Sequence, residues 1–252
     1  MNAAVRDLDE AREPALSIVI PVLNEMDNVV PLAREILAAL APALDFEILF
    51  VDDGSTDATV DRIRTLRAEI PTLRLLRHSK RCGQSAAIRT GVRAARAQWI
   101  ATLDGDCQND PRDLPRMLAV LEQDRAVRLI TGHRRSRQDA WIRRLSSRIA
   151  NTIRRAVLHD ETPDTGCGIK LFHRATFLEV PAFDHMHRFL PALFQREGAK
   201  VVSIDVRHRP REHGRSKYGV GNRLWAGIVD LIGVRWLMRR STAHAHAMEE
   251  PS

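Results

Sequence analysis

The feature that most constrains this chain is an alternation of short apolar runs with longer amphipathic stretches through its first half. Apolar runs that favour strands lie at residues 16–21, 46–51, 73–76 and 99–103, and stretches with helical spacing at 27–40, 57–69, 84–97 and 111–123. Ser55 or Thr56 could cap the second helix, and Pro111 suits the first turn of the fourth. This alternation predicts an α/β fold, with a mostly parallel central sheet flanked by helices.

The pattern changes in the second half of the chain. Residues 127–131 predict a further strand, 134–158 a long basic amphipathic helix, 165–172 a glycine-rich strand, and 200–206 another strand. The two ends, 1–14 and 241–252, are expected to be disordered tails.

Several protein classes are excluded by simple features of the sequence. The longest uncharged runs, at 14–24 and 36–44, have eleven and nine residues, whereas a membrane-spanning helix needs about 18 or more. The N-terminal segment lacks the apolar centre of a secretory signal. Cys82, Cys107 and Cys167 are far apart and form no C-x-x-C pair, so we expect buried apolar cysteines and neither a disulfide framework nor a zinc site. The sequence predicts a cytosolic type of protein with no transmembrane span.

Polar residues gather where three of the first four predicted strands end. They are Asn24 and Glu25 after the first strand, Asp52, Asp53 and Asp57 after the second, and Asp104, Asp106, Gln108 and Asp110 after the fourth. Turn or helix-cap roles explain Asp57 and Asp110. Two carboxylates separated by one glycine, as in Asp104-Gly-Asp106, can instead face one hard cation, with the amide oxygen of Gln108 as a further ligand. Because Mg²⁺ and Mn²⁺ commonly share their coordination with ligand phosphates, the pattern predicts a nucleotide or diphosphate ligand.

Charge is distributed unevenly along the chain. Residues 1–124 carry 15 basic and 20 acidic groups, and residues 125–252 carry 24 basic and 12 acidic groups, which indicates a polyanionic partner for the second half.

Two stripes of apolar residues have arginine flanks: Trp141, Ile142, Leu145, Ile149, Ile153 and Val157 in the first, and Leu224, Trp225, Ile228, Leu231, Ile232 and Leu237 in the second. They resemble interfacial helices on an anionic membrane surface, although an ordinary surface helix remains an alternative. No exposed series of stacking aromatics supports nucleic-acid binding. The histidines show no metal-ligand pattern beyond the pair at 185 and 187, and we expect them at the surface or in packing roles.

Six motifs in order carry a family resemblance. They are Ile20-Pro-Val-Leu-Asn-Glu25, Val51-Asp-Asp-Gly-Ser-Thr-Asp57, Gly83-Gln-Ser-Ala-Ala-Ile-Arg-Thr-Gly91, Leu103-Asp-Gly-Asp-Cys-Gln108, Asp164-Thr-Gly-Cys-Gly-Ile-Lys170 and Arg211-Glu-His-Gly-Arg-Ser-Lys217. Over residues 15–240 the chain resembles the family 2 glycosyltransferases, which have the GT-A (nucleotide-diphospho-sugar transferase) fold. It looks most like the polyprenyl-phosphate branch, which includes dolichol-phosphate mannose synthase and the undecaprenyl-phosphate aminoarabinose transferases.

The resemblance implies roles for the matching residues. The nucleotide pocket would be lined by Pro21, Glu25, Val51, Asp52, Asp53, Asp104 and Gly105, and Mg²⁺ or Mn²⁺ would be held by Asp104, Asp106 and Gln108. The catalytic set would comprise Asp106, Asp164 near the reacting centre, and Arg134, Arg211 and Lys217 on the donor diphosphate or the acceptor phosphate. Residues 15–210 would form the catalytic domain, and residues 211–240 a phosphate-binding loop and an amphipathic interfacial helix.

The implied activity is transfer of a single sugar, with inversion, from a nucleotide-diphosphate sugar to a polyprenyl phosphate. Gly105, Cys107 and Asn109 differ from the corresponding residues of dolichol-phosphate mannose synthases, so a UDP-linked donor is favoured over a GDP-linked one. The expected location is the inner face of the cell membrane, as a peripheral cytoplasmic protein. Two alternatives remain: a transferase with a soluble or protein acceptor, and a non-catalytic protein that binds anionic membranes or nucleic acid. The sequence leaves the oligomeric state open.

Overall fold

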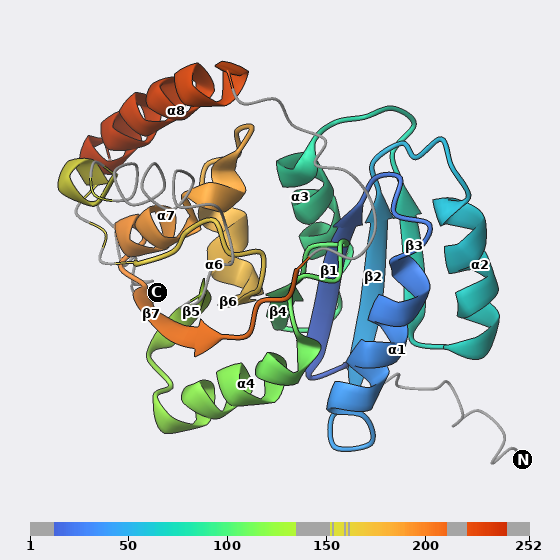
Figure 1. Ribbon diagram of the computed structural model, residues 1–252. Coiled ribbons are helices and arrows are strands. Elements are labelled where there is room, and N and C mark those ends of the chain that lie inside the picture. Colours follow the sequence, from blue (N-terminus) through green and yellow to red (C-terminus); the bar gives the residue numbers. More distant parts are fainter. Residues whose placement is uncertain are drawn as a thin grey trace, which may run out of the picture.

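The computed structural model describes residues 13–134, 152, 154–158, 160, 162–210 and 221–240, with side chains up to residue 210 and from 227 onward. Its centre is a seven-stranded sheet in the order β3-β2-β1-β4-β6-β5-β7 (Figure 1). The strands are β1 (Leu16–Val22), β2 (Phe46–Asp52), β3 (Leu73–Arg77), β4 (Trp99–Thr102), β5 (Val127–Arg134), β6 (Lys170–His173) and β7 (Lys200–Val206). The helices are α1 (Val29–Leu40), α2 (Thr59–Glu69), α3 (Gln84–Ala94), α4 (Leu114–Gln123), α6 (Arg174–Glu179), α7 (Leu190–Arg196) and α8 (Gly221–Arg239), with short 3₁₀ turns η1 (Pro111–Asp113) and η2 (Met186–Arg188).

The directions of the strands place the carboxyl ends of six of them, and the first residue of β6, along the same edge of the sheet. β1 pairs in parallel with β2 and β4, and β5 pairs in parallel with β7. β6 runs antiparallel to both of its neighbours, β4 and β5. Its first residue, Lys170, therefore lies at the edge where the other strands end, in register with Thr102 on one side and Thr131 on the other. Ligands of open α/β sheets bind along this edge.

Each face of the sheet has its own apolar core. Alternate residues of a strand point to opposite faces, and in β1 Ile18 and Ile20 belong to one cluster while Val19 belongs to the other. The first cluster packs against α1, α2 and α4, and the second against α3, α6 and α7. Both are nearly closed to solvent, which explains why the first two strands read as continuous apolar runs.

Apart from the basic helix at 134–158, the predicted elements are confirmed in type, with corrections at their ends. The second helix begins at Thr59 rather than after Ser55 or Thr56, because Ser55 and Thr56 bond instead to Asn24 across the sheet edge. The helix predicted at 84–97 ends at Ala94, and the helix predicted at 111–123 begins with the 3₁₀ turn η1. The glycine-rich strand is shorter than predicted, because residues 165–169 form a loop and only Lys170–His173 pair with neighbouring strands.

The basic helix predicted at 134–158 is described only in part. Arg134 is the last residue of β5 and not helical, and residues 135–151 lie outside the described part of the chain. Residues 154–158 are helical. Arg154, one of the arginines that flank the first apolar stripe, is buried with bonds to Thr165 and Asp160 and is not available to a lipid headgroup. The expected tails fall outside the description except for residues 13 and 14.

The last predicted helix is confirmed as α8, which packs beside α7 (Figure 1). The predicted stripe is divided in the structure: Leu231 and Leu237 pack on the core, whereas Ile228 and Ile232 are exposed. The side chains of Leu224 and Trp225 lie outside the description. None of the described helices has the length and apolar character needed to cross a bilayer.

Candidate active site

The loop after β1 is tied to the loop after β2 by Asn24. The backbone of Asn24 is left-handed, with φ +50°. Its amide donates to Ser55 Oγ at 2.8 Å, and its side-chain Oδ1 accepts from the Thr56 amide at 2.8 Å. The Glu25 amide donates to Thr59 Oγ1 at 2.8 Å. These bonds explain why polar residues follow both strands, since they fix the shape of the rim on which a nucleotide is expected to bind.

Three residues predicted for the nucleotide pocket, at the end of β2 and directly after it, are buried. Val51 is fully buried in the core, where it packs with the cluster that contacts α3. Asp52 is also fully buried, and its Oδ1 accepts from the Ser55 amide at 3.1 Å. Asp53 accepts from the Cys82 and Gly83 amides at 2.8 Å each, and its Oδ1 lies 2.8 Å from His78 Nδ1. The carboxylate of Asp53 therefore anchors the loop that leads into α3.

The predicted carboxylate pair lies directly after β4. Asp106 is buried and Asp104 is partly exposed. Gln84 Nε2 donates to Asp104 Oδ1 at 2.9 Å, and the Asp104 amide donates to Asn109 Oδ1 at 3.1 Å. Burial and the negative charge of Asp106 raise the pKa of Asp104 to about 6. A bound cation relieves the repulsion between two neighbouring carboxylates of this kind, so the residues present fit a hard divalent metal.

Two glycines allow close packing around Asp104 and Asp106. One is Gly105, between the two carboxylates, and the other is Gly168, in the loop before β6. A Cβ on Gly105 would come within 2.8 Å of Val22 Cγ1 and 3.1 Å of Pro21 O, so this glycine lets the loop pack against the end of β1. A Cβ on Gly168 would lie 2.1 Å from Asp104 Oδ2. The glycine-rich loop before β6 therefore forms one wall of the carboxylate site.

Gln108, the third predicted metal ligand, joins the carboxylate loop to the segment after β7. Its side-chain Nε2 donates to the backbone carbonyl of Arg209 at 3.3 Å, and its backbone carbonyl accepts from the Arg209 amide at 3.0 Å. Arg209 then pairs with Glu35 at 2.8 Å and with Asp110 at 2.9 Å. Burial would raise the pKa of Asp110, but hydrogen bonds from Arg112 and Arg209 outweigh it and hold that pKa below its usual range.

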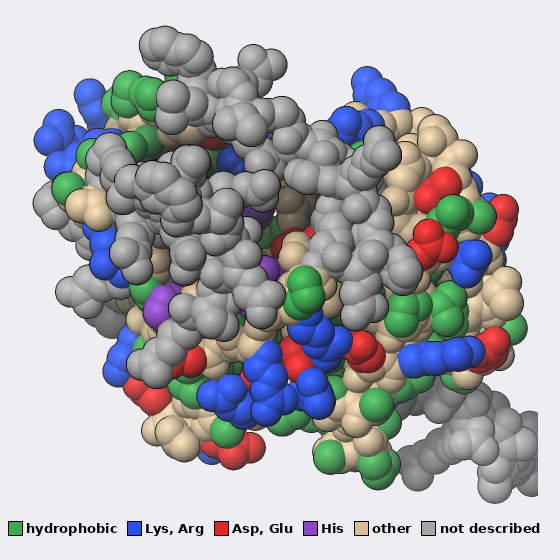
Figure 2. All heavy atoms as spheres, viewed as in Figure 1, with side chains coloured by type: hydrophobic (Ala, Val, Ile, Leu, Met, Phe, Trp, Pro, Cys, Tyr) green, Lys and Arg blue, Asp and Glu red, His purple; other side chains and the backbone are tan. Residues whose placement is uncertain are grey.

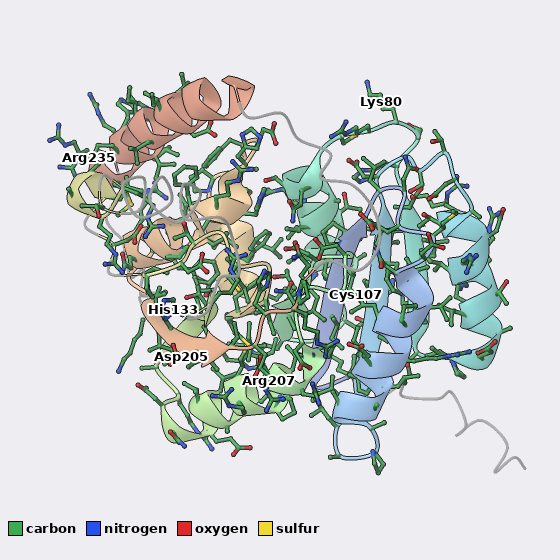
Figure 3. All side chains as sticks on the ribbon, in the orientation of Figure 1. Lys80, Cys107, His133, Asp205, Arg207 and Arg235 are labelled. Atoms are coloured by element: carbon green, nitrogen blue, oxygen red, sulfur yellow. The ribbon has the colours of Figure 1, made fainter. Side chains whose placement is uncertain are left out.

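A basic surface borders this loop. The side chains of Arg112, Arg116 and Arg207 are 63%, 55% and 57% exposed. Figure 2 shows Lys and Arg side chains gathered here, and Figure 3 shows Arg207 at the end of β7 close to α4. The chain then continues to Arg211 and Lys217, two predicted catalytic residues that lie outside the described part.

Two other predicted catalytic residues pair with each other. Arg134 Nε donates to Asp164 Oδ2 at 2.7 Å, and its Nη2 donates to Asp164 Oδ1 at 3.0 Å. Such a fork-to-fork pair fixes both side chains in orientation. Both oxygens of Asp164 are engaged by the guanidinium, which favours a positioning role over that of a general base.

A cavity of about 180 Å³ opens beside Asp104. Its polar wall residues are Gln84 of α3, Thr102 of β4, Lys170 of β6, His187 and Arg188 of η2, and the loop 165–168, and Ile88 and Leu190 complete the wall. Lys170 is 4% exposed and donates to Cys167 O. Burial lowers the pKa of Lys170. Burial, together with the charges of Lys170 and Arg188, lowers the pKa of His187 well below its usual value, so this imidazole is neutral at neutral pH.

No sequence motif indicated this cavity. His187 was expected at the surface or in packing, yet it lines the cavity and lies 2.7 Å from Ser85 Oγ. Lys170 stands among apolar residues of a predicted strand, and this position could have indicated a buried functional lysine. The cysteine prediction is correct for Cys167, which is buried, and wrong for Cys82, which is exposed. Cys107 is intermediate, and Figure 3 shows it near β1 and α1, where its thiol contacts Asn28 O.

Comparison with known proteins places this geometry in a family. The family model of Glycosyl transferase family 2 matches residues 17–180. The dodecaprenyl-phosphate galacturonate synthase of Rhizobium johnstonii is 36% identical over 243 residues, which cover 94% of this chain and 71% of that protein. The undecaprenyl-phosphate 4-deoxy-4-formamido-L-arabinose transferase of Edwardsiella ictaluri is 33% identical over 81% of this chain and 63% of its own length. The chain thus spans less than two thirds of the arabinose transferase.

Solved structures show the same fold at lower sequence identity. Glucosyl-3-phosphoglycerate synthase from Mycobacterium tuberculosis, in complex with Mn²⁺, UDP and glucosyl-3-phosphoglycerate, matches with a TM-score of 0.64 and 21% identity, over 90% of this chain and 80% of that one. The same enzyme in complex with Mg²⁺ and UDP also matches with a TM-score of 0.64 and 21% identity. Together with the family match, these structures establish the predicted GT-A fold. The chain belongs to glycosyl transferase family 2 and is a glycosyltransferase.

Proposed function

We propose that this glycosyltransferase transfers one sugar from a nucleotide-diphosphate donor, UDP-linked in preference to GDP-linked, to a polyprenyl phosphate. The observation that carries the proposal is the Asp104–Asp106 pair beside a cavity with buried Lys170, at the edge where the strands end. The two relatives named above support a polyprenyl-phosphate acceptor. Their named sugars differ, since galacturonate carries a carboxylate and the formamido-arabinose does not, so the relatives leave the sugar open.

Asp104 and Asp106 would hold Mg²⁺ or Mn²⁺, with Gln108 as a further ligand through its Oε1, because its Nε2 already donates to Arg209 O. Such an ion, which accompanies UDP in solved structures of this fold, neutralises charge on the leaving diphosphate. Arg134 orients Asp164, and Gln84 orients Asp104. The second pKa of a phosphate monoester is about 6, so the acceptor is already a competent nucleophile at neutral pH. One direct displacement, without a covalent intermediate, then inverts the anomeric centre.

Contact with an anionic membrane surface follows from the acceptor, because a polyprenyl chain stays in the bilayer. The described surface that suits this contact is one face of α8, where Ile228, Val229, Ile232 and Trp236 are 41%, 64%, 66% and 58% exposed. Arg239 and Arg240 lie at the C-terminal end of this face, and Figure 3 shows Arg235 at the outer side of α8. Apolar side chains with basic neighbours are typical of helices in the interface of anionic leaflets. We therefore infer a peripheral location on the inner face of the cell membrane.

Incubation with undecaprenyl phosphate and single radiolabelled UDP- or GDP-sugars tests the activity. The expected product is a sugar-phosphate lipid that is extracted into organic solvent, forms with one nucleotide class, and needs Mg²⁺ or Mn²⁺. The Asp106→Ala variant is the negative control. Transfer of label only to a water-soluble or protein acceptor would show the alternative transferase, and binding to anionic vesicles without any transfer would show the non-catalytic alternative.

Vesicle sedimentation tests the membrane face separately. The double variant Ile232→Glu with Trp236→Glu should lose binding to anionic vesicles, because it places charge at the centre of the exposed apolar face. Ala68→Glu, on the exposed surface of α2, adds negative charge away from this face and should bind as wild type does. A double variant that still sediments with vesicles like the wild-type protein would rule out α8 as the contact surface.

A further inference from the structure

The cavity beside Asp104 has an apolar part, formed by Ile88 and Leu190, and a polar part with hydrogen-bond donors and cations. Lys170 and Arg188 contribute two positive charges, and Gln84 and His187 contribute an amide and an imidazole. Asp104 is the acidic residue on its wall. With about 180 Å³, it is smaller than the roughly 300–1,000 Å³ of complete ligand sites, so it has the size of a subsite for one part of a ligand.

Lys170 is the unusual member of this cavity, because its ammonium is buried at the start of β6. An isolated buried charge is costly, and such groups are normally paired with an opposite charge. The neighbouring acids are Asp104 and Asp164. Asp164 is held in a two-pronged pair with Arg134, and Asp104 belongs to the proposed metal pair. A divalent ion on Asp104 would weaken the attraction between that carboxylate and Lys170, and an anionic group of the ligand would then stabilise the Lys170 ammonium.

A second hollow of about 270 Å³ adjoins the first and extends the positive surface. It shares Gln84, His187 and Arg188 with the first cavity and adds Arg81. Its acidic member, Asp184, accepts from the His185 amide at 2.8 Å, and its side chain is 71% exposed. Both hollows therefore present cations to whatever lies next to Asp104.

We propose that the donor sugar carries a carboxylate, as in a uronic acid, and that Lys170 and Arg188 bind that carboxylate. The inference rests on the proposed function, because the sugar is joined to the diphosphate that the Asp104–Asp106 pair would hold. The sugar must then occupy the space next to Asp104, where the cavity lies. The charge at this subsite selects a uronate over the matching neutral hexose.

Binding of matched nucleotide-sugars tests this selection. We would measure Kd by calorimetry for UDP-glucuronate against UDP-glucose and for UDP-galacturonate against UDP-galactose, each pair differing only at C6, in the presence of Mn²⁺. A charge-assisted contact predicts that the uronate of at least one pair binds about tenfold or more tightly than its neutral partner. Lys170→Met and Arg188→Gln should each reduce that ratio towards one, while binding of UDP itself should remain. Arg93→Gln, on the exposed C-terminal part of α3, removes a charge away from the cavity and should keep the ratio.

The outcomes separate this inference from the proposed function. Equal or weaker binding of both uronates by the wild-type protein would overturn the inference, and a lipid product from a neutral donor would still support the function. Variants with an unchanged uronate ratio but a raised KM for prenyl phosphate would show that the cations serve the acceptor phosphate instead, which also overturns the inference. A uronate preference that the two variants lose, without any lipid product, would leave the subsite intact and refute the acceptor. If Lys170→Met does not fold, Arg188→Gln and the wild-type ratio decide the question.

Discussion

Replacement of Gly168 by alanine is expected to disable the site by displacing Asp104. The added Cβ would lie 2.1 Å from Asp104 Oδ2 and 2.7 Å from Asn109 Oδ1, whereas real Cβ atoms essentially never approach closer than 3.0 Å. Asp104 or the loop must therefore move by about 0.9 Å. Mg²⁺ demands near-ideal geometry, and a misplacement of about 1 Å can cost roughly 10²-fold in rate. We expect kcat/KM to fall by about that factor, and stability by about 1–3 kcal/mol from overpacking.

The assay compares lipid-product formation with thermal unfolding. A loss of about 1–3 kcal/mol corresponds to roughly 2–12 °C in Tm for a chain of this size. The matched control is Gly198→Ala, at the opposite edge of the sheet. Gly198 has φ +72°, so alanine there is strained, but no atom lies within 4 Å of the added Cβ. The control should therefore lose a similar amount of stability and keep its activity. Wild-type kcat/KM in folded Gly168→Ala would refute the view that Asp104 must be held at this position.

Three further predictions concern the carboxylates. Asp106→Ala should lower kcat by at least about 10²-fold, because a charged ligand of the proposed metal is lost; wild-type turnover in Mg²⁺ and in Mn²⁺ would argue against that ligand. The pKa of Asp104 is raised from the usual 3.8 to about 6, so protons should compete with Mn²⁺ for this carboxylate as the pH falls through 6. Calorimetry that finds the same Mn²⁺ affinity at pH 7 and at pH 5 would contradict this prediction. Asp53→Ala should lower the free energy of unfolding by about 2–4 kcal/mol, since three hydrogen bonds to the loop before α3 are lost. Denaturant unfolding measures that change, and unchanged stability with a raised donor KM would assign Asp53 to nucleotide binding instead.

Local sequence pattern was sufficient for the elements and for the place of the site. Residues 16–21 and 46–51 have the apolar run of a buried strand, and that property depends on adjacent residues alone. Because parallel strands end at one edge, the acidic pair 104 and 106 could be assigned to a common site before the structure was known. The ends of elements were less predictable. Ser55 is a good helix cap by residue type, but its hydroxyl accepts a bond from Asn24, which is 31 positions away.

The tertiary structure decided which of these polar groups remain available to a ligand. Asp52 and Asp53 look equivalent to Asp104 and Asp106 in the sequence. The structure separates them, because Asp53 accepts bonds from residues 25 to 30 positions away, whereas Asp104 lines the cavity. The pairing of Arg134 with Asp164 likewise joins residues 30 positions apart.

Lys170 shows the physical reason for this division. Its strand was identifiable from its apolar neighbours. The antiparallel insertion of β6 between β4 and β5 places its ammonium within the electrostatic influence of Asp104. Strand type depends on a few consecutive side chains, whereas strand order depends on the packing of the whole sheet. The sequence therefore determined the elements, the family motifs and the edge that carries them, and only the fold placed Lys170, His187 and Gly168 around the carboxylates.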